Sequence, residues 1–186
     1  MDTDESIATA IQNGQTELFG ELINRYEAKL TRYGNRFLGS PDDVTDMVQD
    51  VFIKAYTHIQ SFKATERFSP WLYRIAHNTF LNEIRRQKRY GFSLFDIDTD
   101  SLFPHLPAKE TTEDLALDRE RVRQIEAILN ELPLKEREII LLSYFEDMTY
   151  EEMSAVLHLP INTIGVRLYR AKKKLKSLLE KSPPTI

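Results

Sequence analysis

The sequence predicts an all-α protein of two small helical domains that are joined by a flexible acidic linker. Three observations point to this fold class. Apolar residues recur every three or four positions through most of the chain, which is the period of an amphipathic helix. No stretch of useful length alternates apolar and polar residues as a strand does. The helical period is lost over residues 91–112, so we expect domains at 1–90 and 113–186 on either side of that segment.

Helices account for most of the first domain. The apolar spacing predicts one helix over 16–38 and a second that begins at residues 41–42. A loop at 61–70 then leads into a third helix over about 70–89. Pro70 suits the first turn of a helix, because the N–H group that proline lacks would have no partner there.

The second domain begins after the linker. Residues 91–112 contain two prolines and three spaced aspartates and show no helical period. Helix resumes near Glu113 and is broken at Pro133, and a further helix is predicted over 136–145.

The last part of the chain has the pattern of a helix–turn–helix. Thr149 and Glu152 form a capping box, which predicts the start of a short helix over 150–157. Residues 158–160 form a turn, and a second helix begins at about Ile161. One stripe of this second helix is expected to be buried, through Ile164, Leu168, Ala171, Leu175 and Leu178.

Charge is distributed unevenly along the chain, whose net charge is −4. Residues 51–90 and 161–186 each carry a net charge of +6, whereas 1–50 and 110–160 carry −6 and −8. Two basic segments therefore lie far apart in an acidic protein. Segments of this kind are typical of surfaces that contact nucleic acid.

The final helix is the more specific of the two basic segments. Its exposed faces are expected to carry Thr163, Val166, Arg167, Tyr169, Arg170, Lys173, Lys174 and Lys176. The front of such a helix fits a DNA major groove, and the cations behind it reach phosphates. The alternative is a solvated C-terminal helix whose lysines only provide solubility.

Several classes of protein are disfavoured by composition. The chain contains no cysteine, which excludes disulfides and Cys-based metal sites. Its four histidines are scattered, and we find no glycine-rich phosphate loop or nucleophile motif, so no enzyme activity, cofactor or metal is predicted. The acidic N-terminus lacks a signal peptide, and no apolar stretch approaches the ~18 residues that span a bilayer, so we expect a cytoplasmic protein without membrane insertion.

Three stretches carry a resemblance to a known family. The segment 129–175 resembles region 4 of the sigma-70 family of initiation factors. Its sequence is LNELPLKEREIILLSYFEDMTYEEMSAVLHLPINTIGVRLYRAKKKL. Region 2 of the same family resembles DVTDMVQDVFIKAYTHIQSF (43–62) with PWLYRIAHNTFLNEIRRQKR (70–89). A chain with only these two regions is similar to the extracytoplasmic-function (ECF) subgroup. The resemblance implies a factor that binds core RNA polymerase and directs it to promoters.

The resemblance also implies residue roles in the second domain, which would bind the minus-thirty-five element as duplex. The readers would be Gly165, Val166, Tyr169 and Arg170, together with Thr163, Arg167, Lys173 and Lys174. The family commonly has Lys or Arg at the position of Gly165, and Ser or Thr at that of Val166. We expect Gly165 to allow close approach, Val166 to meet a thymine methyl group and Arg170 to bind a guanine edge.

In the first domain, the family places an asparagine at the position of Asn78 to hold a base flipped out of the minus-ten element. An amide can do this because it both donates and accepts hydrogen bonds. Phe62 and Phe68 are expected to offer stacking, and Trp71 is either a DNA contact or core. The predicted minus-ten set is Lys54, Phe62, Lys63, Thr65, Arg67, Trp71, Asn78, Asn82, Arg85 and Arg86.

Protein partners also follow from the resemblance. They are core RNA polymerase, through the clamp helices of its largest subunit and the flap of the second largest, and an anti-sigma factor. The polymerase-binding residues would be Asp46, Gln49, Asp50 and Ile53, whereas Val48 and Phe52 are better explained as core. Aspartates of the linker at 96, 98 and 100 either enter the polymerase cleft or belong to an ordinary solvated linker.

Two other hypotheses stay open from the sequence alone. A DNA-binding regulator would bind an operator through its helix–turn–helix without touching polymerase. A helical adaptor would bind protein and be indifferent to DNA.

Overall fold

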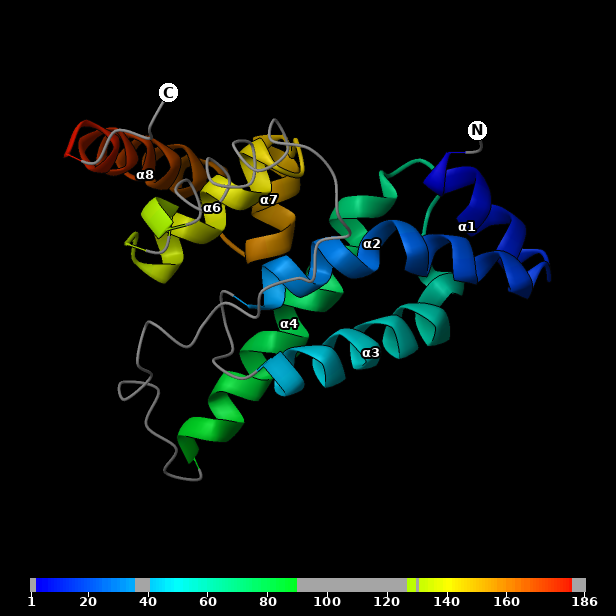
Figure 1. Cartoon of the computed structure of the whole chain (residues 1–186). Helices are drawn as coiled ribbons and strands as arrows, with labels where there is room; N and C mark the ends of the chain where they lie inside the picture. Colours follow the sequence, from blue (N-terminus) through cyan, green and yellow to red (C-terminus); the bar gives the residue numbers. More distant parts are fainter. Residues whose placement is uncertain (1–2, 36–40, 90–126, 130, 182–186) are drawn as a thin grey trace, which may run out of the picture. The chain divides into compact units, whose positions relative to one another are not determined.

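The computed structural model describes residues 3–35, 41–89, 127–129 and 131–181, and the regular structure of these ranges is helical throughout (Figure 1). The all-α prediction is confirmed. The elements, in chain order, are α1 (Asp4–Gln12), η1 (Thr16–Leu18), α2 (Phe19–Gly34), α3 (Pro41–His58), η2 (Ile59–Ser61), α4 (Phe68–Arg89), α6 (Leu134–Tyr144), α7 (Tyr150–Leu157) and α8 (Ile161–Lys181), where η marks a 3-10 turn.

These helices divide into two compact units. The first contains α1 to α4, and the second contains α6, the start of α7, and α8; residues 154–158 at the end of α7 fall into the first unit in this division. The predicted linker and the helix expected from Glu113 to residue 126 lie outside the described residues. The domain limits expected from the sequence therefore stay a prediction.

The core of the first unit is built from α2, α3 and α4, which pack against one another in pairs. Buried aromatic residues fill the centre, and the Tyr33 ring lies 5.1 Å from that of Tyr73 and 5.9 Å from that of Phe80. Gly34 allows the helices to come this close. A Cβ atom at Gly34 would lie 3.0 Å from Cγ1 of Val44 and 3.1 Å from Cζ of Phe80.

Because both neighbours are buried, Gly34→Ala is expected to lower the free energy of unfolding of this unit by about 1–2 kcal/mol through overpacking. Gly20→Ala in the same helix is the matched control. A Cβ atom there meets nothing within 4 Å, so its effect should be a gain of up to ~1 kcal/mol from helix propensity. Denaturation followed by the fluorescence of Trp71, the single tryptophan of the chain, measures both variants. If both variants are more stable than the parent, crowding is not the reason for Gly34.

Helix α1 was not predicted from the sequence. The Thr3 hydroxyl accepts the Ser6 N–H at 3.2 Å and so caps the helix, and Ile7, Ala8 and Ile11 are buried. A helix of 9 residues with three buried side chains is too short for the helical period to be recognised in the sequence.

The other predicted bounds agree closely with the structure. Helix α3 begins at Pro41, α7 covers 150–157 and α8 begins at Ile161, as expected. Helices α4 and α6 each begin two residues earlier than predicted, at Phe68 and Leu134. Helix α2 begins at Phe19 after the 3-10 turn, and residues 36–38 of the predicted helix lie outside the described residues.

In the second unit, α6 packs against α8. The buried side chains of α8 are Ile164, Leu168 and Ala171, which confirms the predicted stripe, and Leu175 and Leu178 are half-buried. The predicted capping box is also confirmed. The Thr149 N–H donates to Oε2 of Glu152 at 2.8 Å, and the Glu152 N–H donates to the Thr149 hydroxyl at 3.2 Å.

Candidate nucleic-acid interfaces

The first unit has a groove of about 380 Å³ between α3, η2 and α4. Its walls are formed by Lys54, His58, Ser61, Trp71, Arg74, Ile75, Asn78, Thr79 and Asn82. The set contains two permanent cations, two amides, two hydroxyls and an indole, and no carboxylate. Cations suit phosphates, amides suit the hydrogen-bonding edge of a base, and an indole suits the face of a base. The lining therefore has the chemistry of a nucleotide site.

Four of the residues predicted for minus-ten DNA meet in this groove: Lys54, Trp71, Asn78 and Asn82. Asn78 and Asn82 are exposed and lie one helical turn apart on α4. The ammonium group of Lys54 lies 2.7 Å from Oδ2 of Asp50 and 3.1 Å from the Thr79 hydroxyl. These two contacts hold the ammonium group of Lys54 in the wall of the groove.

The structure corrects the roles expected of two aromatic residues. Phe62 and Phe68 are 3% and 1% exposed, so their rings are not available to stack on a base. The two rings lie 5.5 Å apart, and each packs on Trp71 at about the same distance. Trp71 is itself 5% exposed, yet it lines the groove. Trp71 is therefore core, as one of the two interpretations expected, and it also forms part of the groove wall. Its contact with DNA stays a prediction.

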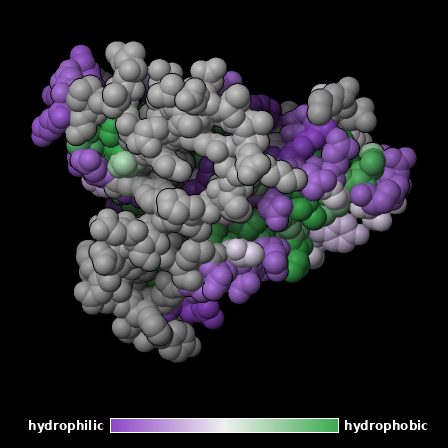
Figure 2. Space-filling view, viewed as in Figure 1, coloured by the Kyte–Doolittle hydropathy of each residue, from purple (hydrophilic) through white to green (hydrophobic). Residues whose placement is uncertain are grey.

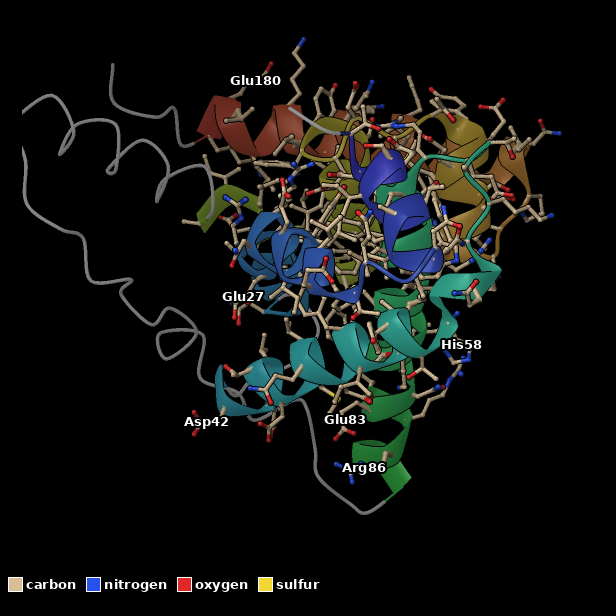
Figure 3. All side chains as sticks on the ribbon, turned by 90° about the vertical axis from the view of Figure 1, so that its right-hand side faces the viewer. Glu27, Asp42, His58, Glu83, Arg86 and Glu180 are labelled. Carbon is tan, nitrogen blue, oxygen red and sulfur yellow. The ribbon has the colours of Figure 1, made fainter. Side chains whose placement is uncertain are left out.

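The remaining predicted residues lie outside the groove. Lys63, Thr65 and Arg67 are exposed in the loop between η2 and α4 and are not among the lining residues. Arg85 is exposed on α4. Arg86 makes two hydrogen bonds to Glu83, at 2.8 and 2.9 Å, and Figure 3 shows these two labelled side chains near the far end of the helix. Glu83 is therefore the partner of the Arg86 guanidinium in the protein without DNA, as Asp50 is the partner of Lys54. A phosphate contact for Arg86 stays a prediction.

Arg74 and His58 line the groove but were missed in the sequence. Arg74 is half-buried and precedes Asn78 by one turn, so the helical period alone places it on the same face. His58 stands at the end of α3 (Figure 3), with Nδ1 lying 2.8 Å from the carbonyl oxygen of Lys54. Because a carbonyl only accepts, Nδ1 carries the hydrogen and Nε2 is left for a ligand.

The second unit has a groove of about 240 Å³ between the first turn of α6 and the front of α8. Four predicted minus-thirty-five readers line it, namely Thr163, Val166, Arg167 and Arg170. Tyr169 is 69% exposed, and Lys173 and Lys174 are exposed further along the helix. Figure 2 shows the far end of α8 as a hydrophilic surface. Lys135 and Glu136, the other two lining residues, were not predicted from the sequence.

Gly165 is half-buried and lies beside α7. A Cβ atom there would be 3.6 Å from Cε2 of Tyr150, which is an ordinary contact distance. Packing within the unit therefore does not require glycine. Close approach of DNA stays a prediction for this residue.

Gly165→Ala is expected to stabilise α8 by up to ~1 kcal/mol, because alanine has the higher helix propensity and the space is available. Hydrogen exchange of the α8 amides should slow by up to about fivefold. Faster exchange would show that the contact with Tyr150 is less tolerant than its distance indicates. Weaker binding to minus-thirty-five DNA, together with slower exchange, would indicate that DNA lies against this glycine.

A third surface lies on the outer face of α3. Asp46, Gln49 and Ile53 are exposed along this face, and Ile53 is 65% exposed although it is apolar. Asp50 is half-buried and paired with Lys54, so it is less accessible than expected. Val48 and Phe52 are buried, as favoured from the sequence. An apolar side chain as exposed as Ile53 is a candidate contact for a protein partner.

The described residues offer neither a membrane-spanning helix nor a metal-binding cluster. None of the helices of the described ranges is both long enough and apolar enough to cross a bilayer. Within the same part of the chain, no cluster of three or more His, Asp or Glu side chains could hold a metal ion.

Both units match models of known protein families. Residues 22–90 match the family described as sigma-70 region 2, and residues 122–175 match sigma-70 region 4. The chain is 31% identical to the ECF RNA polymerase sigma-E factor of Haemophilus influenzae over 96% of both chains. It is 28% identical to the ECF RNA polymerase sigma factor SigW of Bacillus subtilis, over 91% of this chain and 92% of that relative.

Solved structures show the same likeness. CnrH, in complex with the cytosolic domain of CnrY, superposes with a TM-score of 0.65 at 26% identity, over 97% of this chain and 99% of that chain. The sigma factor RpoE, in complex with the anti-sigma factor NepR from Bartonella quintana, gives a TM-score of 0.65 at 26% identity, over 88% and 98%. These likenesses extend over both units.

Proposed function

The chain belongs to the extracytoplasmic-function subgroup of the sigma-70 family. From this premise we propose which promoter element each of its two units contacts. Sigma factors are initiation factors and not enzymes, so the chain binds core RNA polymerase and directs it to promoters. In our proposal the first unit captures the opened minus-ten element. The second unit reads the minus-thirty-five element as duplex.

The observation that supports the first assignment is the make-up of the α3–α4 groove. Asn78, Lys54 and Arg74 line one groove together with Trp71, and none of the lining residues is acidic. Opening DNA costs about 1.4 kcal/mol per base-pair step, and the chain has no ATP-binding motif that could supply this energy. Capturing an unpaired base against the amides of the groove, with cations on its phosphates, offsets part of that cost.

The observation that supports the second assignment is the exposed front of α8. Val166, Tyr169 and Arg170 project from it, and a major groove about 12 Å wide admits such a helix. In our proposal Arg170 binds a guanine edge and Val166 meets a thymine methyl group. Lys173 and Lys174 neutralise phosphates. If the helix neutralises about four phosphates in total, log K should fall with log salt concentration with a slope of about −3.6.

The outer face of α3 is assigned to core polymerase. Asp46, Gln49 and Ile53 are accessible there, whereas the buried side of α3 faces the core of its own unit. Because the factor acts on polymerase and chromosomal DNA, we place it in the cytoplasm. We also propose an anti-sigma partner, because the solved neighbour RpoE is held in a complex with the anti-sigma factor NepR.

The test is transcription in vitro with core polymerase on a library of promoters, with and without the chain. We expect new transcripts only when both proteins are present. Footprinting on a recovered promoter should then show duplex protection at minus thirty-five and permanganate-reactive thymines at minus ten. An absence of added transcripts contradicts the proposal. Full protection by the chain without polymerase would instead indicate a repressor or activator that binds its operator alone.

A further inference from the structure

The N-terminal helix α1 is joined to both ends of the exposed loop 63–67, which lies between η2 and α4 (Figure 1). We infer that α1 is a brace that holds this loop in position for the melted strand, and that Gln12 and Glu5 are its positioning residues. The inference rests on the proposed minus-ten function of the first unit. It assigns a task in DNA capture to a helix outside the groove and outside the region 2 match, which begins at residue 22.

One end of the loop is held by Gln12. Its side-chain amide donates both hydrogens, one to the carbonyl oxygen of Ile59 at 2.7 Å and one to that of Phe62 at 2.8 Å. Gln60 returns a hydrogen bond at 3.1 Å from its own amide to the Gln12 carbonyl oxygen. Ile59 is the first residue of η2 and Phe62 is the residue that follows η2, so Gln12 holds the η2 turn just before the loop.

The other end of the loop is held by Glu5. Its Oε1 atom accepts the backbone N–H of Phe68, the first residue of α4, at 2.9 Å. The first N–H groups of a helix have no partner within the helix, and a negative charge is favourable there. Glu5 therefore caps α4 from a different helix. Glu5 and Gln12 are seven positions apart, which places them two turns apart on one face of α1.

Helix α1 is itself attached firmly to α2, so it can act as a brace. Asp4 accepts hydrogen bonds from the Tyr26 hydroxyl and from Arg25, each at 2.5 Å, and Arg25 also pairs with Glu21. The hydrogen bond to Asp4 raises the pKa of the Arg25 guanidinium above its usual range. Ile7 and Ile11 form part of the buried face of α1. The positions of the loop ends are thus set by α2 through α1.

The loop between these anchors has the features of a DNA-contacting segment. All five residues from 63 to 67 are exposed, and they include Lys63 and Arg67. The flanking rings of Phe62 and Phe68 pack on Trp71, which lines the groove. Fixing both ends of a short loop in advance lowers the entropy lost when it closes over a ligand. Releasing one end should therefore weaken capture of the strand and loosen the packing of Trp71.

The test compares four substitutions at or beside the brace. Gln12→Ala removes both hydrogen bonds to the loop end. Gln12→Glu keeps the size but places a carboxylate against two carbonyl oxygens. Gln60→Ala is the matched control, because it removes only the bond to the Gln12 carbonyl oxygen. Glu5→Gln is a milder variant at the other end, since it keeps an acceptor oxygen and loses the charge.

Two measurements are made on each full-length variant. The first is the emission of Trp71 in the chain without polymerase, which is specific because the sequence has a single tryptophan. The second is the affinity of the polymerase-bound variant for a library-recovered promoter fragment whose minus-ten segment is left unpaired. A fragment with only the duplex minus-thirty-five element serves as the reference probe.

We expect both Gln12 variants to shift the Trp71 emission to longer wavelength and to lose about tenfold in affinity for the unpaired fragment. Glu5→Gln should lose less affinity for the unpaired fragment, and Gln60→Ala should leave that affinity unchanged. The affinity for the duplex fragment should be unchanged in every variant. Unchanged emission and strand affinity in the Gln12 variants would overturn the brace, as would equal losses on both probes. If the parent chain itself fails to bind the unpaired fragment, the proposed function of the groove is wrong. In that case, a shifted Trp71 emission in the Gln12 variants would still show that Gln12 holds the loop in position.

Discussion

Asn78→Ala is expected to reduce opening of the minus-ten element by about 10- to 100-fold while leaving binding to the minus-thirty-five duplex unchanged. Asn78 lines the α3–α4 groove together with Lys54, Arg74 and Trp71. If it holds an unpaired base by donating and accepting hydrogen bonds, its loss removes about 1–3 kcal/mol of strand binding. Each 1.4 kcal/mol corresponds to a factor of ten.

Permanganate reactivity at minus ten and duplex affinity at minus thirty-five measure the two functions separately. Because Asn78 is exposed, the substitution should change the free energy of unfolding by no more than about 0.5 kcal/mol. Asn82→Ala is the comparison on the same face of α4, because Asn82 lines the same groove one turn further along the helix. A smaller effect is expected from it, because the proposal gives the base-holding role to Asn78. Equal losses in opening and in duplex binding would indicate misfolding and would remove the case for base capture.

Arg170→Ala should weaken binding to the minus-thirty-five duplex by about 10- to 100-fold at the preferred sequence. A bidentate contact between an arginine and a guanine edge is worth about 1–3 kcal/mol of discrimination. Arg170 is exposed in the groove between α6 and α8, next to Val166 and Arg167. The loss should be much smaller on a duplex in which the contacted guanine is replaced, because the discrimination comes from that one base pair.

Lys173→Ala is the matched control, since Lys173 lies one turn further along α8 and is also exposed. Removing a phosphate contact should weaken binding to every duplex alike and reduce the salt slope by about 1. Affinities measured for both variants over a range of salt concentrations, on the preferred duplex and on the base-substituted duplex, separate the two roles. If Arg170→Ala behaves like Lys173→Ala on both duplexes, then Arg170 is a phosphate contact and another residue reads the sequence.

The pairing of Arg86 with Glu83 illustrates what a list of basic residues leaves out. Both residues are visible in the sequence at a helical spacing of three, yet Arg86 was assigned to phosphate. The structure ties its guanidinium to a carboxylate that is itself only 8% exposed. Arg74 shows the opposite case, because it was passed over in the sequence and lies in the groove. The spacing of charged residues along a helix shows which face they share, but only the packed structure shows which of them line a groove and which are paired with a carboxylate.

The sequence by itself determined the helical class, most helix limits, the capping box at Thr149 and the buried stripe of α8. These features depend on residues within one or two turns of each other, whose hydrogen bonds and apolar period are local. Tertiary structure alone decided that Phe62 and Phe68 are buried, that α1 exists as a helix and that Gln12 holds a loop fifty residues away. These features arise from contacts between distant segments, which become specific only when the helices pack and exclude water from the surfaces between them.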